Sequence, residues 1–239
     1  MKNITTMLVL GLIESSIELV PEMLAGDPVV VTSAQLRGKP PNHILLDESL
    51  HSKVIRTLPD SQKRGRPDVV HRCLLIALDS VLAKSGHLEV FVHTITGEII
   101  QLATSTRLPR RTQRFVGLME QLLLNKRVPL KGDPLLQIVP GNLETYLKFI
   151  EPSQTFLLSV EGTPMSPTHL AKVLVKETKP VVLMGGFAHG KVNSDVLELV
   201  DQQISIDPEL LAASTIVGMM VHSVEAVLDL STRRFGDVK

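Results

Sequence analysis

The sequence predicts an α/β fold in which a mostly parallel sheet is flanked by helices. In the C-terminal third, three short apolar segments each end at a turn that contains Gly or Pro, and a helical segment separates the first two. Earlier in the chain, 87–93 and 98–103 alternate apolar and polar residues around Thr96-Gly97, which is typical of a β-hairpin. A chain of 239 residues can bury one substantial core. We therefore expect one domain with a β-hairpin and helical insertion.

Strands and short helices are expected to alternate up to residue 60. The apolar run Thr6–Ile13 predicts a strand, and Val29–Val31 favours another because β-branched residues prefer strands. Pro21 would end a short helix that follows the first strand. The expected elements are a strand over 6–13, a helix over 14–20, a strand near 29–31, a loop over 37–41 and a helix over 44–58.

Two helices are predicted around the hairpin. Asp68 stands where an N-cap belongs, ahead of a long apolar helix over 69–84 that Gly86 ends. Thr112 can cap the second helix, whose apolar residues fall on one face. The remaining segments are basic loops at 60–67 and 104–111, a turn-rich connection at 125–133, an apolar run at 135–139 and an unassigned stretch to 152.

The C-terminal part is expected to end in a long helix. Asp207-Pro208 predicts its start, because a carboxylate can cap a helix and Pro fits the first helical position. The helix is apolar nearly all round up to Leu230, which places it in a core or a subunit interface. The elements expected here are strands over 156–160, 180–184 and 203–206 and helices over 167–176 and 208–230.

Composition limits the classes of partner. The formal net charge is zero, which argues against non-specific coating of nucleic acid but allows a local basic patch. Without Trp and with a single Tyr, stacking of bases on aromatic platforms is not expected. The single Cys excludes an intrachain disulfide, and no His or Cys cluster has metal-ligand spacing. No apolar run approaches the roughly 18 residues of a membrane span, so we expect a cytoplasmic protein without a metal or a membrane partner.

A glycine-rich loop marks a candidate ligand site. The apolar strand over 180–184 continues directly into Gly185-Gly186-Phe187-Ala188-His189-Gly190-Lys191. Glycines permit backbone angles and a close ligand approach that a Cβ would prevent. In a parallel sheet such loops gather at the carboxyl ends of the strands, where ligands usually bind. We therefore expect a ligand at this loop.

Two other interpretations of the loop remain open. Gly185–Lys191 fits the phosphate-binding pattern of P-loop NTPases, and Leu74–Asp79 resembles the acidic strand of that class. However, Val192 stands where Ser or Thr must bind magnesium, and the acidic segment precedes the loop. The second interpretation is a tight strand-to-helix turn without a ligand.

Three motifs, in the same order along the chain, resemble those of a known family. They are Arg66-Pro67-Asp68, Thr106-Arg107-Leu108-Pro109-Arg110 with Arg114 and Phe115, and Gly186-Phe187-Ala188-His189-Gly190-Lys191-Val192. Together they resemble the N1-specific pseudouridine methyltransferases of ribosome biogenesis, archaeal type, which are members of the SPOUT superfamily. The resemblance extends from about Arg66 to the end of the chain.

This resemblance implies a single SPOUT-type methyltransferase domain over 1–239 with a C-terminal trefoil knot. Residues 60–115 would contribute the RNA-binding surface, and residues 153–230 the knotted, cofactor-binding part. The implied reaction is methylation of N1 of a pseudouridine in small-subunit ribosomal RNA, with S-adenosyl-L-methionine as cofactor. The implied partners are this RNA, a second copy of the chain and ribosomal proteins. The alternative within the same fold is a non-catalytic ribosome assembly factor that binds ribosomal RNA.

The family's sites can be transferred onto matching positions of this chain. The implied cofactor-binding residues are Val160, Gly185, Gly190, Ser205, Ile206, Asp207, Pro208, Glu209 and Leu210. The implied RNA-binding residues are Arg66, Arg107, Arg110 and Arg114, together with Asp68, which would hold Arg66 in place. A guanidinium suits this role because it can bind a phosphate through two parallel hydrogen bonds. Without the resemblance, the basic loops would equally fit a solvated surface.

Methylation of N1 also requires a route for the proton that this nitrogen loses. Asp79 and His189 are the titratable residues that we consider as candidate catalytic bases. Each has a purely structural alternative, since Asp79 could bond the backbone near the end of its helix and His189 could order the glycine-rich loop. Lys191 resembles a phosphate ligand, but a solvated lysine at a strand-to-helix turn is the simpler interpretation.

Overall fold

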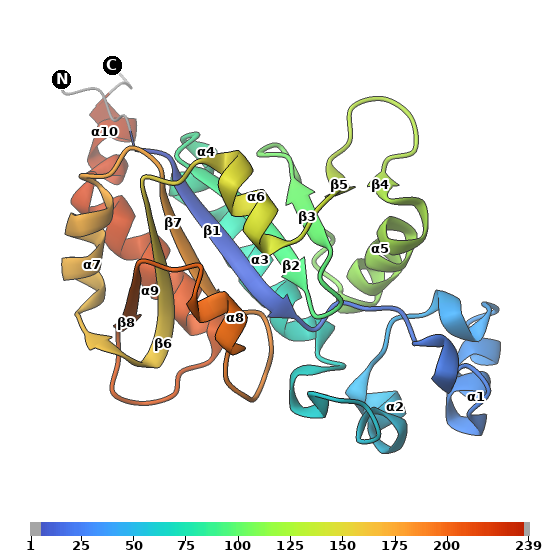
Figure 1. Ribbon diagram of the computed structural model, residues 1–239. Coiled ribbons are helices and arrows are strands. Elements are labelled where there is room, and N and C mark those ends of the chain that lie inside the picture. Colours follow the sequence, from blue (N-terminus) through green and yellow to red (C-terminus); the bar gives the residue numbers. More distant parts are fainter. Residues whose placement is uncertain (1–5, 237–239) are drawn as a thin grey trace.

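The computed structural model describes residues 6–236, which are built around one eight-stranded sheet (Figure 1). The strand order is β4-β5-β3-β2-β1-β7-β6-β8. The strands are β1 (Leu8–Ser15), β2 (Leu88–Thr94), β3 (Ile99–Leu102), β4 (Arg127–Val128), β5 (Leu136–Val139), β6 (Gln154–Pro164), β7 (Pro180–Gly185) and β8 (Gln202–Ser205).

Ten α-helices are found in the described part of the chain. They are α1 (Pro28–Leu36), α2 (Glu48–Ile55), α3 (Pro67–Asp79), α4 (Val81–Lys84), α5 (Thr112–Asn125), α6 (Leu143–Ile150), α7 (Pro167–Leu174), α8 (Ser194–Leu197), α9 (Ala213–Val227) and α10 (Leu230–Gly236). There are also three single-turn 3-10 helices: η1 (Glu22–Leu24) before α1, η2 (Pro41–His43) between α1 and α2, and η3 (Ser61–Lys63) between α2 and α3. No single helix within 6–236 is long and apolar enough to cross a membrane; α9 and α10 would satisfy length and composition only as a pair, and they are bent by 53°.

The sheet has a parallel part and an antiparallel part. β2, β1, β7, β6 and β8 run parallel to one another, whereas β3, β5 and β4 form an antiparallel extension beside β2. All eight residues of the central strand β1 are buried, and Leu10 lies between Val90 of β2 and Val182 of β7. A continuous apolar strand is expected at the centre of a parallel sheet that is covered on both faces. The mostly parallel α/β sheet and the β2–β3 hairpin are therefore confirmed.

Helices cover both faces of this sheet, as Figure 1 shows. Alternate residues of β1 point to opposite faces, so that Leu10 packs with α3, α5, α7 and α9, and Val9 packs with α6 and α8. The larger cluster includes Leu74 of α3, Phe115 of α5, Leu170 of α7 and Val217 of α9. α9 is thus a core helix on the more thickly covered face.

Residues 20–58 form a small lobe with a hydrophobic cluster of its own, which lies beyond the end of β1 (Figure 1). The strand expected near 29–31 is wrong, because this segment belongs to α1. Asp27 caps α1 by accepting a hydrogen bond from Val29 N at 2.8 Å, and Pro28 occupies the first helical position. These two residues outweigh the strand preference of three consecutive valines.

Several other expectations at the ends of elements are also wrong. No helix forms over 14–20, since β1 extends to Ser15, and the helix expected over 44–58 is limited to α2. The helix expected over 208–230 is α9, which begins at Ala213 and ends at Val227, and Asp207 accepts a hydrogen bond from Glu209 N at 2.9 Å inside a turn before it. Asp68 and Thr112 do not cap α3 and α5, whose N-caps are Arg66 and Arg111. α6, in the unassigned stretch, was not expected.

Candidate cofactor cleft and arginine surface

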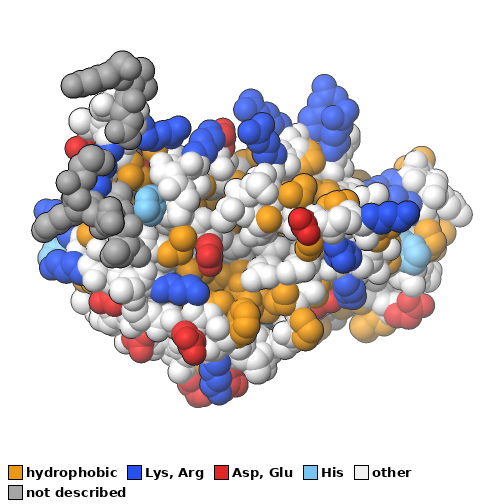
Figure 2. All heavy atoms as spheres, turned by 90° about the horizontal axis from the view of Figure 1, so that it is seen from above, with side chains coloured by type: hydrophobic (Ala, Val, Ile, Leu, Met, Phe, Trp, Pro, Cys, Tyr) orange, Lys and Arg blue, Asp and Glu red, His pale blue; other side chains and the backbone are white. Residues whose placement is uncertain are grey.

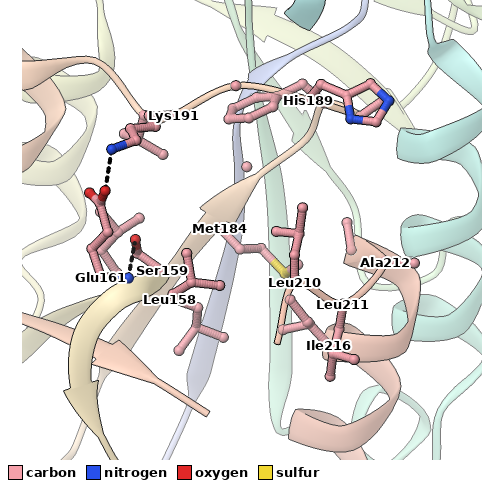
Figure 3. A pocket seen from close by; sticks show the side chains of 18 of the residues that line it. Leu158, Ser159, Glu161, Met184, His189, Lys191, Leu210, Leu211, Ala212 and Ile216 are labelled. Atoms are coloured by element: carbon pink, nitrogen blue, oxygen red, sulfur yellow. Dashed lines mark hydrogen bonds and ion pairs between the residues drawn. The ribbon is translucent and has the colours of Figure 1, made fainter. Parts of the chain in front are cut away.

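A cleft of about 660 Å³ opens at the carboxyl ends of β6, β7 and β8. Three segments form its walls: the end of β6, the glycine-rich loop after β7, and the segment between β8 and α9. In Figure 3, His189 and Lys191 lie along the rim and apolar side chains form the interior. The labelled apolar residues are Leu158, Met184, Leu210, Leu211, Ala212 and Ile216. An apolar interior with a polar rim suits an organic ligand that has a flat apolar part and charged groups.

The β6 wall is a local excursion of the strand. Leu158 and Thr163 both pair with Ile204 of β8, so the residues between them leave the sheet. Gly162 lies against the backbone of Ile204, where a Cβ would overlap with it. The excursion carries Val160 and Glu161 to the cleft.

The glycine-rich loop rests on the end of β1. Gly186 N donates to Ile13 O at 2.8 Å, and Ser16 N donates to Gly186 O at 3.0 Å. A Cβ at Gly186 would overlap with the side chain of Ser15, which accounts for glycine at this position. The backbone of the loop is therefore held by the central strand of the sheet.

A buried ion pair holds the other end of the same loop. Lys63 Nζ lies 2.7 Å from Glu14 Oε2 and 2.7 Å from Asn193 Oδ1, and Asn193 N donates to Glu14 Oε1 at 2.9 Å. The ammonium group also lies 5.2 Å from the ring centroid of Phe187, within the range of a cation–π contact. Lys63 is only 1% exposed, although the sequence predicts a polar, basic loop over 60–67. The ion pair joins β1, η3 and the glycine-rich loop.

One carboxylate binds two guanidinium groups beside the cleft. Asp68 accepts from Arg66 at 2.8 and 2.9 Å and from Arg72 at 2.6 Å. The hydrogen bond with Arg66 is the largest cause that holds the pKa of Asp68 below its usual value. Both guanidinium groups remain partly exposed, and both residues line the cleft. The expectation that Asp68 holds Arg66 in place is supported by this geometry.

The second basic loop is fixed by a histidine that was not expected to matter. His71 of α3 stacks on Phe115 of α5 with ring centroids 4.4 Å apart, and its Nε2 lies 2.7 Å from Pro109 O. Burial is the largest cause that lowers the pKa of His71, which favours the neutral ring. This contact fixes the loop between Arg107 and Arg110 relative to the start of α5.

The expected site residues fall into two groups. Eight of the nine expected cofactor-binding residues line the cleft, namely Val160, Gly185, Gly190, Ser205, Ile206, Asp207, Glu209 and Leu210; Pro208 does not. His189 lines the cleft, whereas Asp79 is outside the lining and pairs with Lys84 at 2.5 Å. The hydrogen bond with Lys84 is the largest cause that lowers the pKa of Asp79. Arg107, Arg110 and Arg114 do not line the cleft, although Arg66 does.

The sequence interpretation missed three residues of this region: Lys63, His71 and Arg72. Arg72 could have been found, because it lies four residues after Asp68 on one helix. Lys63 and His71 carry no local signal, since their partners Glu14 and Pro109 are distant in the sequence.

The geometry of the loop differs from that of a P-loop. A P-loop passes directly from Gly-Lys into a helix whose N-terminus binds phosphate. Here Lys191 forms an exposed ion pair with Glu161 across the cleft (Figure 3), and the following helix α8 begins at Ser194 and has four residues. Fold and site together define an α/β protein with an organic-ligand cleft at the carboxyl edge of its parallel strands.

Comparison with known proteins identifies the family. A model of the EMG1/NEP1 methyltransferase family matches residues 10–225, and the chain belongs to this family. The ribosomal RNA small subunit methyltransferase Nep1 of Pyrococcus furiosus is 43% identical over 212 residues, which cover 89% of this chain and 93% of that protein. The protein of the same name from Thermococcus kodakarensis is 40% identical over 225 residues, covering 94% and 100%.

A solved structure is also similar. The crystal structure of Archaeoglobus fulgidus Nep1 bound to S-adenosylhomocysteine matches with a TM-score of 0.82 and 33% identity, over 94% of this chain and 99% of that chain. The expected family is therefore confirmed.

Proposed function

We propose that this protein methylates N1 of a pseudouridine in small-subunit ribosomal RNA, with S-adenosyl-L-methionine as methyl donor, during biogenesis of the small ribosomal subunit. The observation that carries the proposal is the position of the cleft, whose wall includes Arg66 of the expected RNA-binding set. Family membership supports methyl transfer, and a similar protein has been solved with S-adenosylhomocysteine, the demethylated form of this donor. A ligand and an RNA can thus meet at one place.

The cleft fits the donor in shape and in charge. Its apolar interior can enclose an adenine ring, and backbone groups of 205–210 and the glycine-rich loop are placed to bind the polar parts. The lining carries three carboxylates, those of Glu161, Asp207 and Glu209, and three cationic side chains, those of Arg66, Arg72 and Lys191. Charges of both signs suit a ligand that has a carboxylate, an ammonium group and a positively charged sulfur. We propose the expected set as the cofactor-binding residues, with Pro208 shaping the backbone behind them.

When bound, S-adenosyl-L-methionine supplies an electrophilic methyl group. This chain must place N1 of the base in line with that group and accept the proton that N1 loses as the new bond forms. Of the two candidate bases, His189 has the better position, because it lies at the rim of the cleft. Asp79 lies outside the lining of the cleft and pairs with Lys84, so it is the weaker candidate.

The expected RNA-binding arginines form what we call the arginine surface, which would bind the RNA strand on either side of the target nucleotide. They are Arg66, Arg107, Arg110 and Arg114. Arg66 is restrained by Asp68, and the Arg107–Arg110 loop is restrained through His71. Guanidinium groups that are held in place lose less conformational freedom when they bind phosphate. The double variant Arg107→Ala/Arg110→Ala should therefore bind RNA more weakly, with a log-log salt slope reduced by roughly 0.7 to 0.9 for each phosphate that the protein no longer neutralises.

We further propose that the protein acts in the cytoplasm as a homodimer, with a C-terminal knot in each subunit and an RNA surface that combines both copies. α9 carries apolar residues on more than one face, and Met219, which does not line the cleft, is only partly buried. A partly exposed apolar helix favours a subunit contact. Light scattering of the pure protein tests this, and a monomer at all concentrations would contradict it.

The decisive experiment is mass spectrometry of a short ribosomal RNA hairpin after incubation with the protein and S-adenosyl-L-methionine. The target base is supplied as pseudouridine in one RNA and as uridine in a matched control. We expect a mass gain of one methyl group on the pseudouridine RNA alone. If neither RNA gains a methyl group while calorimetry detects donor binding, the catalytic proposal is wrong and the protein is better described as an RNA-binding assembly factor.

A further inference from the structure

Arg66 and Arg72 share one carboxylate at the wall of the cleft. Both residues, with Val69 between them, line the cleft at steps of three along the start of α3. This spacing places them on one side of the helix. Asp68 holds both guanidinium groups on that side.

The shared carboxylate leaves hydrogen-bond donors of the two arginines unused. Asp68 is the one carboxylate within residues 6–236 that pairs with Arg72, while Arg66 also lies 4.0 Å from the exposed Glu48. A guanidinium has five N–H donors, and each arginine uses only Nε and one Nη2 hydrogen within this cluster. The Nη1 group of Arg72 therefore has no partner within residues 6–236, and Nη1 of Arg66 faces only the exposed Glu48, beyond hydrogen-bond distance.

The position of the pair determines which anion this is. A base can be methylated only if its nucleotide enters the cleft, and its flanking phosphates must then lie at the mouth of the cleft. Arg72 lines the cleft, whereas Arg107, Arg110 and Arg114 do not. These three are placed for phosphates further along the strand.

We propose that Arg72 is a further RNA-binding residue, which binds a phosphate next to the target nucleotide together with Arg66. This inference rests on the proposed RNA substrate. The same chemistry, an oxyanion on a guanidinium, also fits the carboxylate of the donor's methionine, so the test measures RNA and donor separately.

The test compares Arg72→Gln with the wild-type protein. The first measurement is RNA affinity at several salt concentrations, with the pseudouridine hairpin as probe. We expect Arg72→Gln to bind more weakly, with a log-log salt slope reduced by about 0.7, the value for one phosphate of a single strand that is no longer neutralised. The affinity for S-adenosyl-L-methionine, measured by calorimetry, should stay unchanged.

The matched control is Lys148→Gln. Lys148 forms an i,i+4 ion pair with Glu144 on α6, on the opposite face of the sheet, and the variant removes the same unit of charge. Its salt slope should equal that of the wild type, which separates a local contact from the general effect of net charge.

A neutral methylphosphonate in place of each phosphate next to the target locates the contact. At the correct phosphate, the substitution should weaken wild-type binding and should cause little further loss in Arg72→Gln, because the two changes remove one interaction. Additive losses at both neighbouring phosphates, or an unchanged salt slope, would overturn the inference. A loss of donor affinity with unchanged RNA binding would overturn it in favour of the methionine carboxylate. If the wild-type protein does not bind or methylate the hairpin at all, the proposed function itself fails.

Discussion

Two buried glutamates, four residues apart, show how differently one structural problem can be solved. Glu14 and Glu18 are 3% and 2% exposed, and each pairs with a basic residue of the 60–67 segment, Lys63 and Arg64. Both oxygens of Glu14 have partners, since Lys63 and Asn193 N bind one each. Within residues 6–236, Oε1 of Glu18 has none.

Burial changes the protonation of Glu18. Burial is the largest cause that raises the pKa of Glu18 to about 7, against the lowering effect of Arg64. Full hydrogen bonding makes Glu14 a fixed anchor for the glycine-rich loop. The protonation of Glu18, at the base of the lobe, changes near neutral pH. At Glu18 the ion pair with Arg64 alone does not offset burial of the carboxyl group, whose Oε1 has no hydrogen-bond partner within residues 6–236.

Removal of Lys63, the cation that pairs with Glu14, should have the largest effect on stability. Lys63→Met leaves a buried carboxylate without its cation, so the free energy of unfolding should fall by about 3 to 5 kcal/mol. Urea denaturation measures this value. The double variant Glu14→Gln/Lys63→Met should recover part of the loss, because the uncompensated charge is gone. A loss below about 1 kcal/mol in Lys63→Met would mean that the pair adds little to stability.

Glu18 should make stability depend on pH. Its pKa of about 7 in the folded protein lies above the ordinary 4.5, so the native state keeps a proton that the unfolded chain has released. The free energy of unfolding should therefore fall as pH rises from about 4.5 to 7, by up to about 3 kcal/mol. Urea denaturation at pH 5 and pH 8 should give a smaller difference for Glu18→Gln than for the wild type. Equal differences in the two proteins would contradict the assignment.

A substitution of Arg64 tests whether this residue stabilises the protein through the charge of Glu18. Arg64→Met removes the cation beside Glu18, but protonation can neutralise this carboxylate. We expect a loss of about 1 to 2 kcal/mol at pH 8 and a smaller loss at pH 5, where Glu18 holds a proton in the folded state. Unfolding of the variant at both pH values tests this. A loss that is the same at pH 5 and pH 8 would show that Arg64 does not act through the charge of Glu18.

The exposed ion pair between Lys191 of the glycine-rich loop and Glu161 of β6 should have the smallest effect on stability. Lys191 and Glu161 are 79% and 54% exposed at the side chain, so solvent screens their attraction. Lys191→Gln should change the free energy of unfolding by no more than about 0.5 kcal/mol in the same urea assay. A loss similar to that of Lys63→Met would show that the whole loop, and not only its Asn193 end, depends on ion pairs.

The sequence predicts the central parallel strands well because β1, β6 and β7 each contain a short apolar run. It fails at 29–31, where the cap formed by Asp27 and Pro28 outweighs β-branched preference, and at Pro208, where a good capping pair sits in a turn. The cleft was predictable because its residues follow strands that end at one edge of the sheet. The buried state of Lys63 was not, since it depends on Glu14 and Asn193, 49 and 130 residues away.

The β6 excursion is a part of the cleft wall whose number of residues can vary. Leu158 and Thr163 both pair with Ile204. The length of chain between them therefore does not affect how β6 and β8 align. Extra residues placed there would project beside the cleft while the pairing on either side stays as it is. Within this architecture the width of the ligand site can therefore change by insertion or deletion, independently of the core that supports it.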